Sequence, residues 1–306
     1  MRVGLVHTVS SPCRCAEFIG KHLRLLGHET FDVDADRIEA SVGALAAADL
    51  VFDHTDTVAG RGLFRGVVRQ LLEQRGARVA GSSAAACSRA DDKLAMRAAL
   101  ARAGVPVAPG AGIERACDPL PASISWPRVL KPCFEHMSRG VVIARDEAEL
   151  RALAAELLAR HREPLVVERF IAGREVGVTV LGREGALRVL PPMAWERSGE
   201  SAMLTWERKL EASEESFHPA RLTAAEAARL EAAALAAFRA LDLRDYARFD
   251  VRVDATGEPF FLDANVRPSL EESSPTIHAG ARAGMGYAQV LEAIIDAALA
   301  RPRPEA

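Results

Sequence analysis

The chain has 306 residues, 49% of them hydrophobic and 26% charged, with a formal net charge of −3. A chain of this length and composition can fill the cores of two or three packed units. Its small negative charge argues against binding to nucleic acids or membrane surfaces through bulk charge. No apolar run approaches the roughly 20 residues that span a bilayer, and residues 1–10 are typical of a buried strand, without a signal-peptide pattern. Five irregularly spaced cysteines favour a reducing, cytoplasmic compartment over a disulfide framework.

Residues 1–83 alternate short apolar runs with amphipathic stretches and are predicted to form the first domain. Because strands and helices alternate, a parallel sheet built from βα units is expected. Ligands of such sheets bind at the carboxyl ends of the strands, so the loops near residues 7–15 and 54–62 are candidate substrate contacts. The predicted strands span residues 2–7, 28–34, 48–54 and 77–83, and the predicted helices span residues 16–27 and 63–76.

Residues 84–171 are predicted to form a second, mixed α and β unit. One helix begins near Asp91 and ends at Gly104, which is a suitable residue for closing a helix. Apolar strands are expected at residues 127–133 and 164–171, with another helix before residue 162.

Residues 172–306 are predicted to form the third unit. Antiparallel strands are expected at residues 175–182 and 186–195, and the polar stretch 196–219 has few apolar anchors, which predicts a mobile loop. Thr223 and Glu226 have the spacing of a capping box and begin a long alanine-rich helix. A hairpin at residues 248–269 and a helix at residues 287–300 complete the unit.

The hairpin contains Asp250, Asp263 and Asn265 among apolar residues, on either side of the turn-forming sequence at residues 254–257. Because strand side chains alternate, Asp263 and Asn265 share a face, which Asp250 on the partner strand can join. Two adjacent carboxylates in a low-dielectric setting repel each other, and Mg²⁺, which prefers oxygen ligands, would relieve the repulsion. The alternative is that both aspartates are exposed or paired with neighbouring arginines, namely Arg248, Arg252 or Arg267.

The chain has 39 basic residues, but only four are lysines: Lys21, Lys93, Lys131 and Lys209. A compact ammonium group can enter a crowded phosphate site as a point charge, which the larger guanidinium group does less readily. Lys131 ends an apolar strand beside a loop, a position that suits a phosphate contact. The alternative explanation for each lysine is chance.

Cys13 and Cys15 form a Cys-x-Cys pair. Without a second pair or a nearby histidine in the sequence, such a pair is more often structural than metal-binding.

Five short motifs follow one another along the chain: DK at 92–93, VLKP at 129–132, VVERFIAGREVGV at 166–178, ERK at 207–209 and RFDV to FFLDAN at 248–265. Their order and spacing resemble those of the ATP-grasp fold, and the chain most resembles its D-alanine–D-alanine ligase branch. The match covers roughly residues 80–290. The resemblance implies an α/β protein in which two α+β subdomains, residues 84–171 and 172–306, enclose ATP behind an N-terminal parallel βα domain.

The resemblance also implies residue roles. Arg248 matches the arginine that stabilises the transferring phosphoryl group and the tetrahedral intermediate, and Lys209 matches a lysine that a loop brings to the terminal phosphates. Asp250, Asp263 and Asn265 match the ligands of two Mg²⁺ ions, which Mn²⁺ can replace. The ATP contacts implied are Lys93, Lys131, Glu168, Phe170, Ile171, Glu175, Lys209 and Leu262.

Such an enzyme activates a carboxylate as an acyl phosphate, which an amine then attacks to form an amide. Its partners are therefore small carboxylate and amine substrates, and the family suggests a homodimer.

The substrate-binding positions match the family only in part. Ser274 matches the serine that binds the second substrate's carboxylate, but Arg61, Arg267 and Ser269 depart from the family pattern. Glu17 is a poor substitute for the acid that binds the first substrate's amine. Both arginines are candidates to hold an extra carboxylate or are plain surface charge.

These departures favour a ligase for an amino acid or related acid other than D-alanine. D-alanine–D-alanine ligation is the second hypothesis, and an ATP-binding protein without ligase activity is the third.

Overall fold

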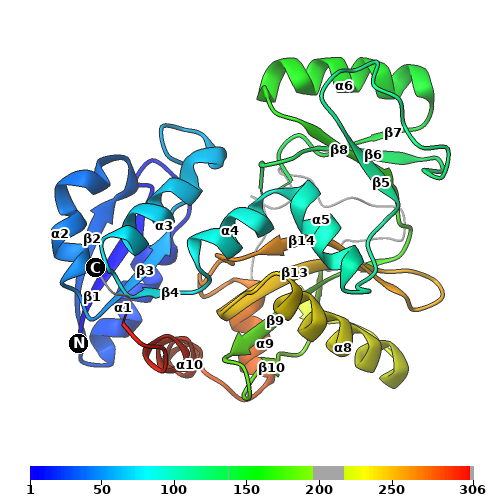
Figure 1. Ribbon diagram of the computed structural model, residues 1–306. Coiled ribbons are helices and arrows are strands. Elements are labelled where there is room, and N and C mark those ends of the chain that lie inside the picture. The colour runs from blue at the N-terminus through cyan, green and yellow to red at the C-terminus, as the bar shows by residue number, and fades with distance from the viewer. Residues whose placement is uncertain (137, 196–216, 304–306) are drawn as a thin grey trace.

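The computed structural model describes residues 1–136, 138–195 and 217–303, which contain three β-sheets and the helices that pack on them (Figure 1). The N-terminal sheet lies at one end of the molecule, and the other two sheets lie one above the other at the opposite end (Figure 1). Within the described ranges, no helix combines the length and apolar character needed to cross a membrane.

The N-terminal sheet is parallel, as predicted, and its strand order is β2-β1-β3-β4. Alternation along β1 places Val3 and Leu5 in a core with α1, and Val6 in a second core with α2 and α3 on the other face. Helices cover both faces of the sheet, so the carboxyl ends of its strands are the part that can contact a ligand. The elements are β1 (Arg2–His7), α1 (Cys15–Leu25), β2 (Glu29–Asp34), η1 (Ala35–Ser41), α2 (Val42–Ala46), β3 (Leu50–His54), η2 (Gly62–Phe64), α3 (Arg65–Gln74) and β4 (Val79–Ala80).

The central sheet is antiparallel, with the order β5-β8-β6-β7, and α6 covers one face. Leu130 and Val167 point into the core with Leu150 and Leu157 of α6. Because side chains alternate, Lys131 and Glu168, the neighbours of those core residues, point to the opposite face of the sheet. The elements are β5 (Gly110–Ile113), β6 (Arg128–Pro132), β7 (Val142–Ala144), α6 (Glu147–His161) and β8 (Leu165–Arg169).

The C-terminal sheet has the order β12-β11-β9-β13-β14, with β10 paired to β9. The prediction of a single strand at residues 186–195 is wrong. It divides into β10 and β11 because Pro191 and Pro192, which lack an N–H group to pair, stand between them. The elements are β9 (Arg174–Gly182), β10 (Arg188–Val189), β11 (Met193–Trp195), β12 (Phe217–Pro219), α8 (Ala224–Ala240), β13 (Asp245–Val253) and β14 (Pro259–Asn265).

Helices connect the sheets. α4 (Ala84–Asp91) and α5 (Lys93–Arg102) contribute to the core of the C-terminal sheet, where α8 also packs and starts with the predicted capping box. After β14, the chain forms α9 (Pro275–Arg282) and α10 (Tyr287–Leu299). The apolar face of α10 shares one core with β1, β3 and α1 of the N-terminal unit.

Candidate active site

Antiparallel pairing in the hairpin brings the acidic residues together. Asp250 of β13 is the register partner of Asp263 of β14, and Arg248 is the partner of Asn265. The register shifts at a bulge directly after Asp250. All four side chains line the cavities described below, and carboxylate and amide oxygens are the donors that a hard cation such as Mg²⁺ prefers.

The first cavity lies between the central and C-terminal sheets. Besides Lys93, Asp250 and Asp263, it is lined by the strand-end and loop residues of both sheets. Its remaining lining residues are Val129, Lys131, Pro132, Glu135, Ser138, Arg139, Val141, Glu168, Arg169, Phe170, Ile171, Glu175, Arg252 and Leu262.

Lys131 is one of the buried cationic residues that line the first cavity. Its Nζ lies 2.7 Å from a carboxylate oxygen of Glu168 and donates to the backbone carbonyl of Leu262 at 3.0 Å. Glu168 also accepts from Arg97. Burial lowers the pKa of Lys131, and Glu168 opposes that effect. The ammonium group therefore lies in a desolvated setting, where an added anion is attracted strongly.

Lys93 lies at the junction of two cavities, together with Asp250 and Asp263. It is the first residue of α5, and its Nζ lies 3.8 Å from Asp263 Oδ1 and donates to the backbone carbonyl of Glu135. At the other end of the first cavity, Arg252 donates to Glu175 at 3.0 Å.

The second cavity lies between the loops of the N-terminal unit and the acidic hairpin. Arg248 lines it and donates from Nε to Asp250 Oδ1 at 2.8 Å. Burial alone would lower the pKa of Arg248, but the Asp250 carboxylate outweighs burial and raises it. The other lining residues are Pro12, Cys13, Cys15, His54, Thr55, Asp56, Arg65, Asp91, Lys93, His136, Trp195, Phe217, Asp263, Ala264, Asn265, Arg267, Ser269, Glu271, Ser273, Ser274 and Pro275.

Arg267 does not offer its guanidinium ends freely to a ligand. Its two terminal nitrogens donate to Asp53 at 3.2 Å and to Asp91 at 2.9 Å, and the side chain is buried. Asp53 also accepts from Arg69 at 3.1 Å, and Asp91 accepts from Arg65 at 3.0 Å. Arg267 is therefore neither a surface charge nor a guanidinium group that is free to bind a substrate carboxylate. It is part of a buried network of ion pairs.

Arg61 lines neither of these cavities, and its contact with substrate stays a prediction beside the alternative of plain surface charge. Val58 and Arg61 form a tight turn with Ala59 and Gly60 at positive φ, and this turn directs the exposed Arg61 side chain over the ring of Phe64, at 4.9 Å. Glu17 also lies outside, as an exposed partner of Arg14 at 2.7 Å.

Ser274 and Ser269 both line the second cavity. Ser274 is the N-cap of α9, so the positive end of that helix faces the cavity. Ser269 Oγ lies 3.5 Å from the sulfur of Cys15. Lys209, the remaining predicted site residue, lies outside the described residues, as does most of the predicted mobile loop; of that loop, residues 217–219 form β12.

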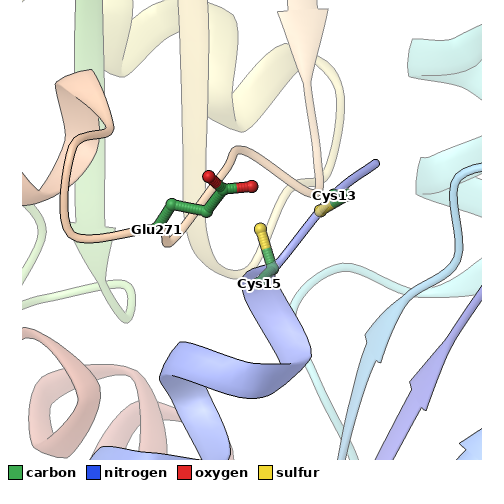
Figure 2. A group of neighbouring side chains, drawn as sticks. All are labelled: Cys13, Cys15 and Glu271. Carbon is green, nitrogen blue, oxygen red and sulfur yellow. The ribbon is translucent and has the colours of Figure 1, made fainter. Parts of the chain in front are cut away.

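Several residues of the second cavity belong to none of the five motifs that carry the family resemblance. Cys13 and Cys15 meet Glu271, which is far away in the chain (Figure 2). His54 ends β3, and its Nε2 lies 3.1 Å from the hydroxyl of Tyr246. Only the position of His54 at the carboxyl end of a parallel strand indicated a site residue. The cysteines drew attention as a pair, but nothing in their spacing indicated Glu271.

Comparisons with known proteins agree with this geometry. The family model described as D-ala D-ala ligase C-terminus matches residues 100–296. A D-alanine–D-alanine ligase of Anaeromyxobacter sp. is 33% identical over 285 residues, covering 90% of this chain and 88% of that protein. The uncharacterized protein y4sG of Sinorhizobium fredii is 30% identical over 296 residues, covering 93% of this chain and 87% of that protein.

A solved structure of the D-alanine–D-alanine ligase of Bacillus anthracis, complexed with ATP, superimposes with a TM-score of 0.78 at 21% identity, covering 98% of this chain and 97% of that chain. This similarity confirms the predicted fold. The chain therefore belongs to the D-alanine–D-alanine ligase family, whose members are ATP-grasp ligases that use ATP and Mg²⁺.

Proposed function

We propose that this protein joins a carboxylic acid to an amine, with ATP consumed to ADP and phosphate through an acyl-phosphate intermediate. We further propose that its substrate is an amino acid or related acid other than D-alanine. One observation carries the proposal. The two cavities have a common wall made by Lys93, Asp250 and Asp263, so a nucleotide's terminal phosphate in the first cavity would meet a carboxylate in the second.

The charges at this wall suit phosphoryl transfer. A carboxylate and a γ-phosphate repel each other, and cations must offset that repulsion before the two react. Lys131 and Lys93 supply positive charge along the first cavity, and Arg248 supplies it where the second cavity begins. Arg248 is held in place by Asp250, so its charge is oriented before a substrate binds.

Asp250, Asp263 and Asn265 would hold the Mg²⁺ ions, because Asp250 and Asp263 are register partners at the common wall and Asn265, two residues after Asp263 on β14, lines the second cavity. Bound there, Mg²⁺ (or Mn²⁺) neutralises phosphate charge. The remaining nucleotide contacts proposed are Glu168, Phe170, Ile171, Glu175 and Leu262 in the first cavity, with Lys209 outside the described residues.

The walls of the second cavity favour a substrate other than D-alanine. Cys13, Cys15 and His54 occupy the side where the family resemblance implies an acidic residue for the first substrate's amine, and Glu17 does not reach the cavity. Ser274 at the N-terminus of α9 suits a substrate carboxylate. Ser269 lines the same cavity, and Arg267, held by its ion pairs with Asp53 and Asp91, forms part of the cavity wall.

A screen of paired substrates tests the proposal. The protein, ATP and Mg²⁺ are combined with pairs of amino acids of both chiralities and with simple carboxylic acids, and phosphate release is measured. Turnover that needs a pair without D-alanine supports the proposal. Turnover with D-alanine alone supports D-alanine–D-alanine ligation instead. Tight ATP binding without turnover for any pair supports an ATP-binding protein without ligase activity.

The division into residues 1–83, 84–171 and 172–306 and the homodimer remain proposals. Limited proteolysis followed by mass spectrometry of the fragments tests the division. Light scattering of the intact chain tests the dimer.

A further inference from the structure

Cys13, Cys15 and Glu271 converge at the wall of the second cavity (Figure 2). Their two sulfurs and a carboxylate oxygen all lie within 4.8 Å of one another. Sulfurs bound to one tetrahedral Zn²⁺ lie roughly 3.8 Å apart, given Zn–S bonds of about 2.3 Å. From a limit of 4.8 Å, the two sulfurs need to approach each other by at most about 1 Å, and each sulfur and the carboxylate oxygen by at most about 1.3 Å, to reach zinc-binding distances.

The environment of Cys15 suits a thiolate, which is the form of cysteine that binds metal. The backbone N–H of Leu270 points to its sulfur at 3.3 Å, and Ser269 Oγ lies 3.5 Å away. Ser269 Oγ also accepts the backbone N–H of Glu271 at 3.2 Å.

A backbone hydrogen bond holds the Glu271 carboxylate near the two sulfurs. The backbone N–H of Arg14, the residue between the two cysteines, donates to Glu271 Oε1 at 2.9 Å. This bond joins the cysteine loop to the segment after β14 and fixes the carboxylate as an outer hydrogen bond fixes a metal ligand. The other carboxylate oxygen adds a second candidate ligand atom.

We propose that Cys13, Cys15 and Glu271 form a binding site for a soft divalent cation, Zn²⁺, with a coordination position open to the second cavity. Two sulfurs and one carboxylate oxygen give three protein ligands, the number typical of zinc sites that keep a position for water or substrate. The oxygen-only group at Asp250, Asp263 and Asn265 differs in chemistry, because thiolate ligands favour zinc over magnesium. The site goes beyond the proposed ligase function and does not depend on it.

Metal titration tests this inference without ATP or substrates, so its outcome is independent of ligase activity. The reduced, metal-free, full-length protein is titrated with Zn²⁺ against a chromogenic zinc chelator, with excess Mg²⁺ present to occupy oxygen-only sites. We expect one tightly bound Zn²⁺ per chain. Co²⁺ is then used as a spectroscopic probe, and we expect a sulfur-to-metal charge-transfer band. Absence of tight zinc binding, or Co²⁺ binding without that band, would overturn the proposal.

Substitutions locate the ligands. Cys13→Ser, Cys15→Ser and Glu271→Gln should each weaken zinc binding at least about tenfold, while Cys117→Ser, which alters an exposed cysteine outside the group, should leave it unchanged. Thermal unfolding of each variant shows whether the fold persists. If a cysteine variant does not fold, the zinc affinity of Glu271→Gln and the Co²⁺ band of the unmodified protein still test the proposed zinc site. Equal zinc affinity in all the variants would contradict the assignment.

Discussion

Asp250 and Asp263 face each other directly across the β13–β14 ladder, one carboxylate opposite the other. Like charges at opposing positions destabilise a sheet. Each carboxylate here has a cation nearby: Arg248 lies 2.8 Å from Asp250, and Lys93 lies 3.8 Å from Asp263. The fold therefore tolerates the two carboxylates side by side, and together they still attract an added cation.

Asp263→Asn should abolish the Mg²⁺-dependent reaction without harming the fold. Removing one carboxylate relieves the repulsion between the pair, so the midpoint of thermal unfolding should stay the same or rise. Phosphate release should fall by a factor on the order of 100 or more, because a ligand for the phosphate-bound cation is lost. Asp242→Asn, at an exposed residue on a loop, is the matched control. Activity that survives in Asp263→Asn would remove this residue from the metal site.

Arg248→Ala should keep most of the ATP affinity and lose the chemical step. An arginine that stabilises a transferring phosphoryl group contributes on the order of 10³ to 10⁵ in rate. Calorimetry gives the ATP dissociation constant, and single-turnover phosphate release gives the rate. Arg248→Lys keeps the charge but not the two-pronged geometry of the bond to Asp250, so it should recover little. Near-normal turnover in either variant would show that Arg248 has another role.

Lys131→Met should weaken ATP binding roughly 10- to 100-fold, because a buried ammonium group in the first cavity is lost. Arg97 still pairs with Glu168 in that variant, so the fold should hold. Lys21→Met, at an exposed lysine paired with Glu272, serves as the control. A competition assay with a fluorescent ATP analogue measures both. Unchanged affinity in Lys131→Met would exclude Lys131 from the nucleotide site.

Asp53→Ala should destabilise the protein strongly. Asp53 is fully buried and accepts from Arg69 and Arg267, so its removal leaves two guanidinium groups buried with too few partners. The expected loss is about 3–5 kcal/mol in the free energy of unfolding, measured by urea denaturation. Asp32→Asn, on an exposed part of β2, should cost far less. A small effect of Asp53→Ala would mean that water enters the network.

The same network predicts the response to acid. Burial alone would raise the pKa values of Asp53 and Asp91, but their arginine partners hold both pKa values below the ordinary range. Their contribution is therefore complete above the unfolded-state pKa of about 3.9 and is lost as the pH falls through the lower folded-state values. The stability gap between the unmodified protein and Asp53→Ala should stay constant from pH 7 to about pH 4.5 and narrow below it. A gap that widens in acid would contradict the assignment.

Local patterns in the sequence predicted the features that depend on neighbouring residues. The period of two along β14 put Asp263 and Asn265 together, and the turn at 254–257 brought β13 alongside. The spacing of Thr223 and Glu226 predicted the start of α8. These features follow from rules that act over a few residues.

Contacts between distant segments could not be read in the same way. Arg267 meets Asp53 and Asp91 only because the N-terminal sheet, α4 and the end of β14 come together in space. The pairing of Cys15 with Glu271 depends on the same docking. The orientation of Arg61 could not be predicted either, because one tight turn decides which way its side chain points.

The position of α10 has a consequence for how the protein is made. Val290, Leu291 and Ile294 of this helix cover the same face of the N-terminal sheet as α1, in a core with Leu5 and Phe52. During synthesis the sheet leaves the ribosome long before α10 does. Part of its apolar face therefore stays exposed until the last helix is translated, and a chain cut short before α10 carries an unfinished first domain as well as a missing last helix.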